Sequence, residues 1–386
     1  MDPAVLTAAA LSFDPDLARV AWTEWIALSD DEQQALLDHG DRAGLSLYLW
    51  RAAQDLGFAE RIRFAGDYRE RRRKNEIRLQ QRVHETAELC ALFDAQGFRF
   101  AVLKGFLMAP DFIASAADRS QYDLDFYLGE ADARAAFEML RARGYKPVAE
   151  AQDGPSLHLP TLENPAPRTW RGDFYDPEHP VLGIELHTRL WYPEFERIFV
   201  SFDPDPLERL IDRNGFPSFR LDDQLAACTL HALRHVFRSS LRLSHLYEIA
   251  SFLARHERDE SFWASWRVWG NPPMRDLCAA GFALAARVFQ APMPQMHVPA
   301  SAAAWIERYG ATVVDNARRD KSQIFLQLAF VPGWRDRLAV MQRRLAPMKM
   351  PRRSDAKRSS SFLMRRAAFH IVALFRFLRT AAEIWF

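Results

Sequence analysis

The chain has 386 residues, enough for two or three domains of about 100–200 residues each. Its 51 lysines and arginines balance 50 aspartates and glutamates, so no strong net charge draws it toward nucleic acid. Three widely separated cysteines argue against a disulfide framework or a cysteine metal site, and they fit a reducing, cytoplasmic compartment. The sequence starts without the basic segment of a secretion signal, and no uncharged apolar run of about 18 residues predicts a membrane-spanning helix.

The first 95 residues predict helices, and the last and longest of these is expected from about residue 67 to residue 95. The residues expected on its sheet-packing face are Ile77, Leu79, Val83, Ala87, Cys90, Ala91 and Phe93. A basic cluster near its start is either a solvated face partnered by Glu70 and Glu76 or a contact for phosphate groups. This basic cluster comprises Arg69, Arg71, Arg72, Arg73 and Lys74.

Residues 96–200 predict a small mixed sheet. Its first strand is the apolar run from Phe98 to Leu103, and its second runs from Tyr122 to Leu128, where acidic and apolar residues alternate. Because side chains two apart on a strand share a face, Asp123 and Asp125 are expected to point the same way. Two adjacent carboxylates repel each other unless one is protonated or a cation lies between them.

A second alternating stretch, from Val181 to Leu190, places Glu185 and His187 on one face. If this stretch pairs beside the first one, Glu185 joins Asp123 and Asp125 in a cluster of three carboxylates. Such a cluster is the ligand set that a two-metal phosphoryl-transfer site requires. Oxygen ligands and a phosphate-bearing substrate indicate Mg²⁺, or Mn²⁺ in its place.

These stretches belong to a longer pattern: L-K-G, a helix, R-x-x-x-D-x-D, a helix that ends in Gly-Tyr, and I-E-L-H. The residues that carry it are Lys104, Gly105, Arg119, Asp123, Asp125, Gly144, Tyr145, Glu185 and His187. The pattern closely resembles the bacterial family of uncharacterised nucleotidyltransferases, within the DNA polymerase β-like superfamily. The resemblance covers about residues 75–253 and includes His231, His235 and Arg242-Leu243.

The resemblance implies an enzyme that binds a divalent metal and a nucleoside triphosphate (NTP). By position, Asp123 and Asp125 would be metal ligands, and Glu185 would be the third acidic residue. Lys104 and Gly105 stand where the superfamily has its phosphate-contacting turn.

The sequence departs from the wider superfamily at that turn, because Phe106 follows the glycine. The hydroxyl that would help to hold the triphosphate is therefore missing there, and Lys104, Arg119 or Ser120 is expected to replace it. Thr188 also stands where the family commonly has a tryptophan after the Glu-x-His motif. These departures bear on which nucleotide is bound more than on metal binding.

His231 and His235 are expected on one face of a helix whose N-cap is Asp222. Three interpretations stand side by side. The pair packs within the protein, contacts substrate together with His187, or binds zinc, for which the sequence offers no evident third ligand.

The segment from Asp153 to Pro180 is rich in proline, glycine and charge, which predicts a long loop or loose hairpin near the site. We expect it to close over the substrate. His158, Arg168 and Arg171 are its candidate substrate contacts.

From about residue 204 to residue 330 the chain is expected to be helical, with Trp263, Trp266 and Trp269 as packing residues. The segment after Pro332 is basic, and because Pro347, Pro351 and Ser359-Ser360-Ser361 interrupt it, part of it is expected to be a flexible linker. The last stretch, 362–386, predicts an amphipathic helix whose apolar face is Leu363, Ala367, Ile371, Leu374, Leu378, Ala381 and Trp385. Such a basic helix either lies on a membrane surface or docks on its own protein.

The expected fold is α+β: a helical region at 1–95, a nucleotidyltransferase core at 96–200, a helical domain at 201–330 and a basic tail at 331–386. The expected partners are an NTP and an unknown hydroxyl-bearing acceptor, with peripheral contact to the inner membrane face through 362–386. One alternative is a non-catalytic module that binds a nucleotide or a protein partner. Another is a nucleic-acid enzyme, which the near-neutral charge disfavours.

Overall fold

The computed structural model describes residues 2–148, 156–163, 174–177, 183–314 and 321–345, and residues 371, 374, 375, 378 and 382 near the C-terminus. Helices predominate in these parts, and a mixed five-stranded sheet and a two-stranded sheet accompany them. The fold is therefore α+β, as the sequence predicts.

The described part of the N-terminal half contains five short helices, one long helix and the larger sheet. Its helices are α1 (Pro3–Ala10), α2 (Pro15–Ala27), α3 (Asp30–Ala43), α4 (Ser46–Asp55), α5 (Ala65–Ala95) and α6 (Glu130–Ala142). Its strands are β1 (Phe100–Leu103), β2 (Asp123–Leu128), β3 (Lys146–Pro147), β4 (Leu162–Glu163) and β5 (Gly183–His187). The strand order is β1-β2-β5-β4-β3, in which β2 and β5 are parallel and the other neighbours are antiparallel.

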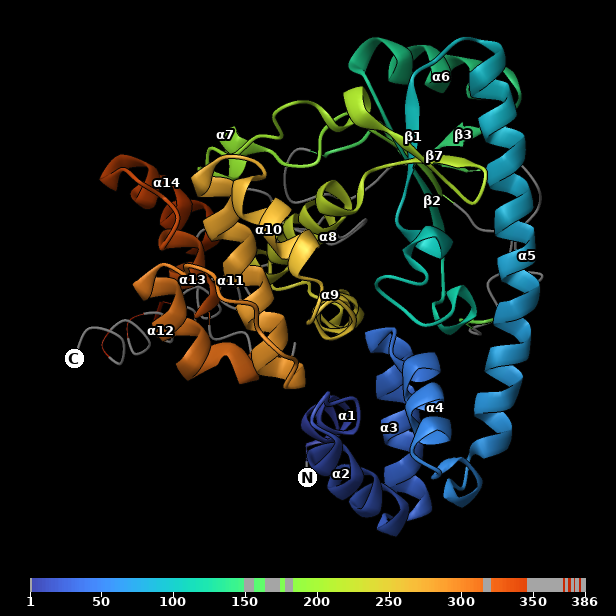
Figure 1. Cartoon of the computed structure of the whole chain (residues 1–386), viewed down its shortest axis with the longest axis vertical. Helices are drawn as coiled ribbons and strands as arrows, with labels where there is room; N and C mark the ends of the chain where they lie inside the picture. The colour runs from blue at the N-terminus through green and yellow to red at the C-terminus, as the bar shows by residue number, and fades with distance from the viewer. Residues whose placement is uncertain are drawn as a thin grey trace, which may run out of the picture.

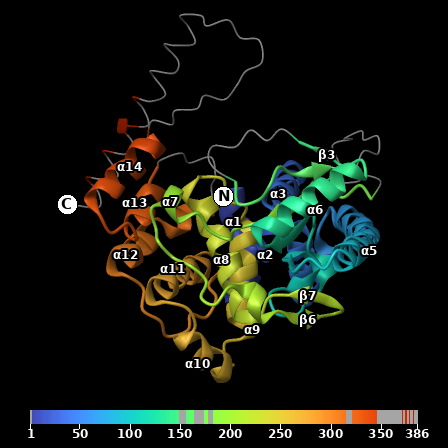
Figure 2. The same cartoon turned by 90° about the horizontal axis from the view of Figure 1, so that it is seen from above.

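In the described residues of the C-terminal half, the regular structure is helical apart from one hairpin. Its elements are α7 (Pro193–Glu196), β6 (Ile211–Arg213), β7 (Phe216–Ser218), α8 (Leu221–Phe237), α9 (Leu243–Arg255), α10 (Glu260–Val268), α11 (Pro272–Phe289), α12 (Ala300–Tyr309), α13 (Gln323–Leu328) and α14 (Trp334–Leu345). Helices α8 and α9 lie between the sheet with α5 on one side and α11 to α14 on the other (Figure 1, Figure 2). The sheet therefore meets the C-terminal helices along α8 and α9.

The hairpin corrects the expectation that the chain is helical from about residue 204. Asn214 and Gly215 connect β6 to β7, with φ angles of 56° and 83°. Asn-Gly is the preferred pair for a two-residue turn of this kind, because both positions need a positive φ. Helix α8 then begins at Leu221, so Asp222 lies in its first turn and is not the N-cap as expected.

Helix α5 spans the length of the molecule beside the sheet (Figure 1). Its sheet-packing face is the expected one in part: Cys90 and Phe93 are buried and Leu79 and Val83 pack against the same cluster. Ala87 and Ala91, which were also expected there, are exposed. The buried residues along its middle and end are Asn75, Arg78, Arg82, Thr86, Leu89, Cys90 and Phe93. Polar side chains can face inward here because they bind backbone groups: the Asn75 amide donates to the carbonyl oxygens of Ala117 and Arg119 at 2.9 and 3.0 Å.

The basic cluster at the start of α5 is paired within the protein. Arg71 donates to both carboxylate oxygens of Asp41: Nη2 to Oδ2 at 2.8 Å and Nε to Oδ1 at 3.1 Å. The remaining pairs are Arg69 with Glu60, Arg72 with Glu76 and Asp118, and Arg73 and Lys74 with Glu70. These ion pairs leave little reason to assign the cluster to phosphate groups.

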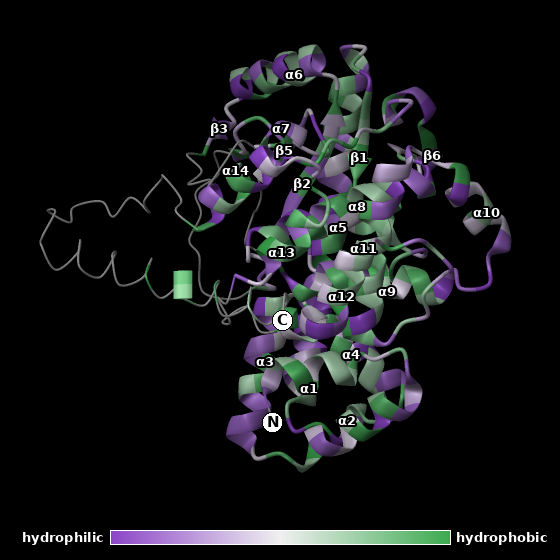
Figure 3. Cartoon of the chain, turned by 90° about the vertical axis from the view of Figure 1, so that its left-hand side faces the viewer, coloured by the Kyte–Doolittle hydropathy of each residue, from purple (hydrophilic) through white to green (hydrophobic). Residues whose placement is uncertain are grey.

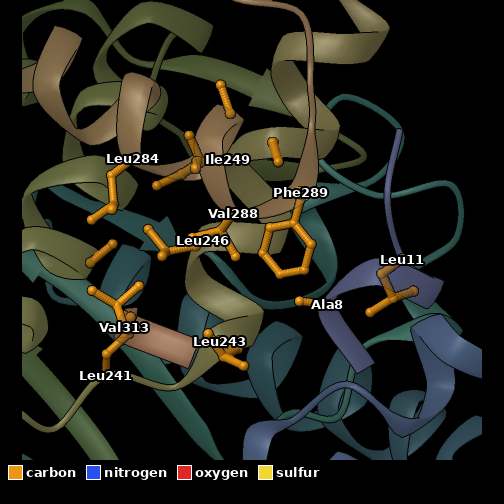
Figure 4. Close-up of a cluster of buried hydrophobic side chains, with 14 of the residues drawn as sticks. Ala8, Leu11, Leu241, Leu243, Leu246, Ile249, Leu284, Val288, Phe289 and Val313 are labelled. Carbon is orange, nitrogen blue, oxygen red and sulfur yellow. The ribbon is translucent and has the colours of Figure 1, made fainter. Parts of the chain in front are cut away.

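The hydrophobic core joins both ends of the chain. One continuous cluster of buried side chains includes α1 to α4 and α8 to α14, and Figure 4 shows Ala8 and Leu11 beside Val288 and Phe289. Hydrophobic residues predominate in α8 and α11 and hydrophilic ones in α3, which lies at the surface (Figure 3). The expected packing tryptophans, Trp263, Trp266 and Trp269, are all buried in this cluster.

The start of the basic tail is a docked helix, and Pro347, Pro351 and Ser359-Ser360-Ser361, where a linker was expected, lie outside the described residues. In α14, Arg344 donates to the buried carboxylate of Glu196 at 2.7 Å, and Arg343 lies over the Phe195 ring. The arginines near residue 340 thus have partners on α7.

Most of the stretch 362–386 lies outside the described residues. Of its expected apolar face, Ile371, Leu374 and Leu378 are helical and exposed, as is Phe375. Contact with a membrane surface stays a prediction. Within the part of the chain that the structure describes, no helix has the length and apolar character needed to cross a membrane.

Candidate active site

The carboxylates meet where β2 and β5 lie side by side. The two strands pair in parallel, and Asp125 is directly opposite Glu185. Because alternate residues share a face, Asp123 lies beside this pair while Leu124 and Phe126 are buried in the core on the other face. The three carboxylates open into one cleft, whose wall also includes Lys104, Arg119, Ser120, Tyr122, His231, Arg242, His245 and Glu248.

The three acidic side chains are electrostatically unequal. Burial, followed by the charges of Asp125 and Glu185, raises the pKa of Asp123 well above the usual carboxyl range. Burial would also raise the pKa of Asp125, but the Lys104 charge and the hydrogen bond from His187 outweigh it and hold that pKa low. A cluster whose members oppose one another's ionisation in this way fits a divalent cation, which removes the repulsion.

His187 lies at the inner end of the cluster and is 4% exposed. Its Nε2 is 2.8 Å from Oδ1 of Asp125 and 3.3 Å from Oε2 of Glu185. Burial lowers the pKa of His187, yet hydrogen bonds to these two carboxylates raise it above the ordinary value overall. His158 packs edge-on against the His187 ring, and its Nε2 is 3.6 Å from Glu185.

Lys104 enters the cleft from a turn directly after β1. Both Lys104 and Gly105 have positive φ angles, 52° and 59°. The turn directs Nζ of Lys104 to within 3.7 Å of Oδ2 of Asp125 and 3.2 Å of Nδ1 of His231. A Cβ at Gly105 would lie 2.5 Å from the Gln121 amide, so a side chain there would displace Gln121 and would also have to adopt a positive φ. The sheet thus fixes one cation against the acidic cluster.

A sequence model of the family described as uncharacterised nucleotidyltransferase matches residues 29–290. The chain belongs to this family. The matched range extends beyond the motifs on both sides, from α3 to the end of α11, so it includes every residue of the cleft. Searches of the curated proteins and of the solved structures give no match.

In this nucleotidyltransferase, Arg119 is held by residues that sequence analysis did not single out. Its Nε donates to Oε1 of Glu248 on α9 at 2.8 Å, and Tyr48 on α4 donates to the same oxygen at 2.9 Å. Glu248 is 5% exposed and its Oε2 takes no part in these bonds. No short motif links these residues, because they come from three distant parts of the chain.

The expected histidine pair has a third member. His231 and His235 on α8 lie with ring centroids 4.6 Å apart, and His245 on α9 is 4.7 and 5.3 Å from them. Burial and nearby cations, first among them Lys104 for His231, hold the pKa of each histidine below the ordinary value. The structure thus supplies a third possible zinc ligand, since the three rings each offer a nitrogen and these atoms lie within 4.8 Å of one another. The positive charges of Lys104, Arg234 and Arg242 nearby oppose a metal cation at this place.

The remaining predicted contacts differ in position. His231 lines the cleft, whereas His235 lies behind it and bonds to Ser240 at 3.0 Å. His158 reaches the cluster through Glu185. Arg168 and Arg171 lie outside the described residues, as does most of the segment expected to close over the substrate.

Proposed function

We propose that the protein transfers a nucleoside monophosphate from an NTP to a hydroxyl group of an acceptor and releases pyrophosphate. The observation that carries this proposal is the pairing of β2 with β5, which brings Asp125 opposite Glu185 and beside Asp123. Membership of the nucleotidyltransferase family supports the reaction class.

Asp123, Asp125 and Glu185 are the residues that would hold Mg²⁺ or Mn²⁺. The donor set fits, because it consists of carboxylate oxygens gathered in one cleft with opposed pKa shifts. When bound, such a metal activates the acceptor oxygen and neutralises phosphate charge.

Basic residues among those that line the cleft supply positive charge for the triphosphate. Lys104 and Arg119 lie within the wall, and Arg242 lies at its exposed edge. His231 and His245 add neutral ring nitrogens. In the reaction, the acceptor oxygen bonds to the α-phosphorus while the bond to the pyrophosphate oxygen breaks. Cations fixed near the leaving pyrophosphate stabilise the charge that develops there.

The test is incubation of the purified chain with each α-³²P-labelled NTP and Mg²⁺ or Mn²⁺, alone and with cell lysate. We expect label transfer or pyrophosphate release with the wild type and loss of both in Asp123→Asn and Asp125→Asn. The exposed residue Asp31 on α3 provides a matched control, because Asp31→Asn removes a carboxylate far from the cleft. Wild-type rates in the Asp123 and Asp125 variants would refute the proposal, and nucleotide binding without turnover would instead support a binding module.

A further inference from the structure

One histidine in the acidic cluster is better placed than the others to contact a bound cation. Nε2 of His187 lies 2.8 Å from an oxygen of Asp125 and 3.3 Å from an oxygen of Glu185. These three side chains each offer one donor atom, and the three atoms lie within 4.8 Å of one another. His187 is fixed in place, since it pairs with Tyr127 across the strands and packs against the ring of His158.

The spacing of these atoms matches that of neighbouring ligands around one ion. Octahedral bonds of about 2.1 Å place adjacent ligand atoms about 3 Å apart. The two distances from Nε2, 2.8 and 3.3 Å, lie on either side of that value. An ion held by the facing oxygens of Asp125 and Glu185 would therefore be within bonding distance of Nε2 after only small movements.

We infer that His187 is a direct ligand of the metal, so that the site has mixed oxygen and nitrogen donors and prefers Mn²⁺ to Mg²⁺. This inference rests on the proposed function, because it places the ligand in the same metal site. Imidazole nitrogen suits transition-metal ions, whereas Mg²⁺ favours oxygen donors and keeps its waters.

The other role for such a histidine is to orient a carboxylate from outside without touching the metal. Two features favour direct ligation. Nε2 faces oxygens of two carboxylates from different strands, whereas an orienting group typically contacts one ligand from behind. Asp125 also already has an outer partner, because its other oxygen, Oδ2, faces Lys104 at 3.7 Å.

The experiment uses the full chain and Mn²⁺ alone. Electron spin-echo envelope modulation detects a ¹⁴N nucleus bonded directly to Mn²⁺, and the signal of free Mn²⁺ gives the affinity in the same sample. We expect nitrogen modulation in the wild type and its loss in His187→Gln. We also expect this variant to bind Mn²⁺ at least about 10–100-fold more weakly while its affinity for Mg²⁺ changes little. Loss of an orienting histidine would weaken binding by a similar factor, so the nitrogen modulation is the measurement that separates the two roles.

Two neighbouring histidines provide matched controls. His158→Gln and His231→Gln remove rings that contact the cluster or Lys104 but leave Nε2 of His187 in place, so both should keep the modulation. If His187→Gln does not fold, wild-type protein and these two variants with ¹⁵N-labelled histidine serve instead. The ¹⁴N modulation should then be replaced by ¹⁵N modulation in all three.

Two results would overturn the inference, and only one of them would also contradict the proposed metal site. If Mn²⁺ binds, is lost in Asp125→Asn and shows no nitrogen modulation, then His187 is not a ligand but the proposed metal site holds. If Mn²⁺ does not bind, or binds equally well to Asp125→Asn, the proposed function loses its metal site as well.

Discussion

The hydroxyl of Tyr48 donates to Oε1 of Glu248 at 2.9 Å and so links two helices that are 200 residues apart in the sequence. Both side chains are almost fully buried, and the same oxygen accepts a hydrogen bond from Arg119 in the wall of the cleft. Helix α4 therefore contacts the site directly, because Tyr48 binds the same Glu248 oxygen that holds Arg119.

Removing this hydroxyl should destabilise the protein and loosen the cleft. We expect Tyr48→Phe to lower the free energy of unfolding by about 1–2 kcal/mol, because a buried hydrogen bond to a charged group is lost. Glu248 keeps its bond to Arg119 but loses the hydrogen bond from Tyr48. Arg119 is then held less firmly, so the KM for NTP should rise. Denaturant unfolding and steady-state kinetics measure the two effects.

Tyr247 offers the matched control. Its ring centroid lies 4.7 Å from that of Tyr48, and its hydroxyl makes no hydrogen bond with the described residues. Tyr247→Phe should therefore change stability by less than about 0.5 kcal/mol. Equal effects of the two substitutions would show that the Tyr48 hydroxyl contributes nothing specific.

A substitution at Lys104 tests whether its positive charge serves the triphosphate. Lys104→Met keeps the length of the side chain but removes the charge between Asp125 and His231. We expect kcat/KM for NTP to fall by about 10²–10³-fold, the scale found for removal of one preorganised charge partner. Lys146→Met provides a control, because Lys146 is an exposed lysine on β3. A change in the KM for the acceptor alone would argue that Lys104 does not serve the triphosphate.

The acidic cluster shows what the sequence could predict. The alternation at residues 122–128 and 181–190 predicts two strands, and the structure has β2 at Asp123–Leu128 and β5 at Gly183–His187. The pairing itself was only a condition in the sequence, and the structure supplies it: β2 and β5 are parallel neighbours, with Asp125 opposite Glu185. Local patterns thus predict the strands and their faces, whereas the approach of Glu185 to Asp123 and Asp125 depends on a contact distant in sequence.

The features that were missed depend on contacts distant in sequence. The inward face of α5 is polar around Asn75 because it binds the backbone of the loop before β2, which no periodicity reveals. Glu248 and His245 reach the cleft from α9 only because α8 and α9 pack together. The hairpin could have been predicted, because Asn214-Gly215 is a turn signal in the sequence. It was missed because the whole region was expected to be helical.

A substitution at Gly105 tests whether the turn that positions Lys104 requires a glycine. Gly105→Ala should lower the free energy of unfolding by about 1–3 kcal/mol, since the residue has a φ of 59° and the new methyl group would meet Gln121. The double variant with Gln121→Ala removes the steric conflict but keeps the cost of the positive φ. Its loss of unfolding free energy should therefore be smaller than the sum of the two single losses. Full additivity in this double-mutant cycle, measured by denaturant unfolding, would show that the two residues do not compete for space.

Asp123 links the metal site to stability. Its pKa is raised in the folded protein, so the native state holds this proton more tightly than the unfolded chain does. The metal-free wild type must therefore lose stability relative to Asp123→Asn as the pH rises above the ordinary carboxyl range near about 4. The difference should stop growing once the pH has passed the raised native pKa.

We expect metal-free Asp123→Asn to be more stable than the wild type by about 1–3 kcal/mol at neutral pH and equal to it below about pH 4. Urea unfolding in the presence of a chelator, repeated across this range, measures the difference. Adding Mn²⁺ should reverse the order, because only the wild type keeps the full set of carboxylate ligands and binding to the native state stabilises it. If the two proteins differ by a constant amount at every pH, the Asp123 carboxyl does not carry the repulsion of the cluster. A variant that Mn²⁺ stabilises as much as the wild type would remove Asp123 from the proposed ligands.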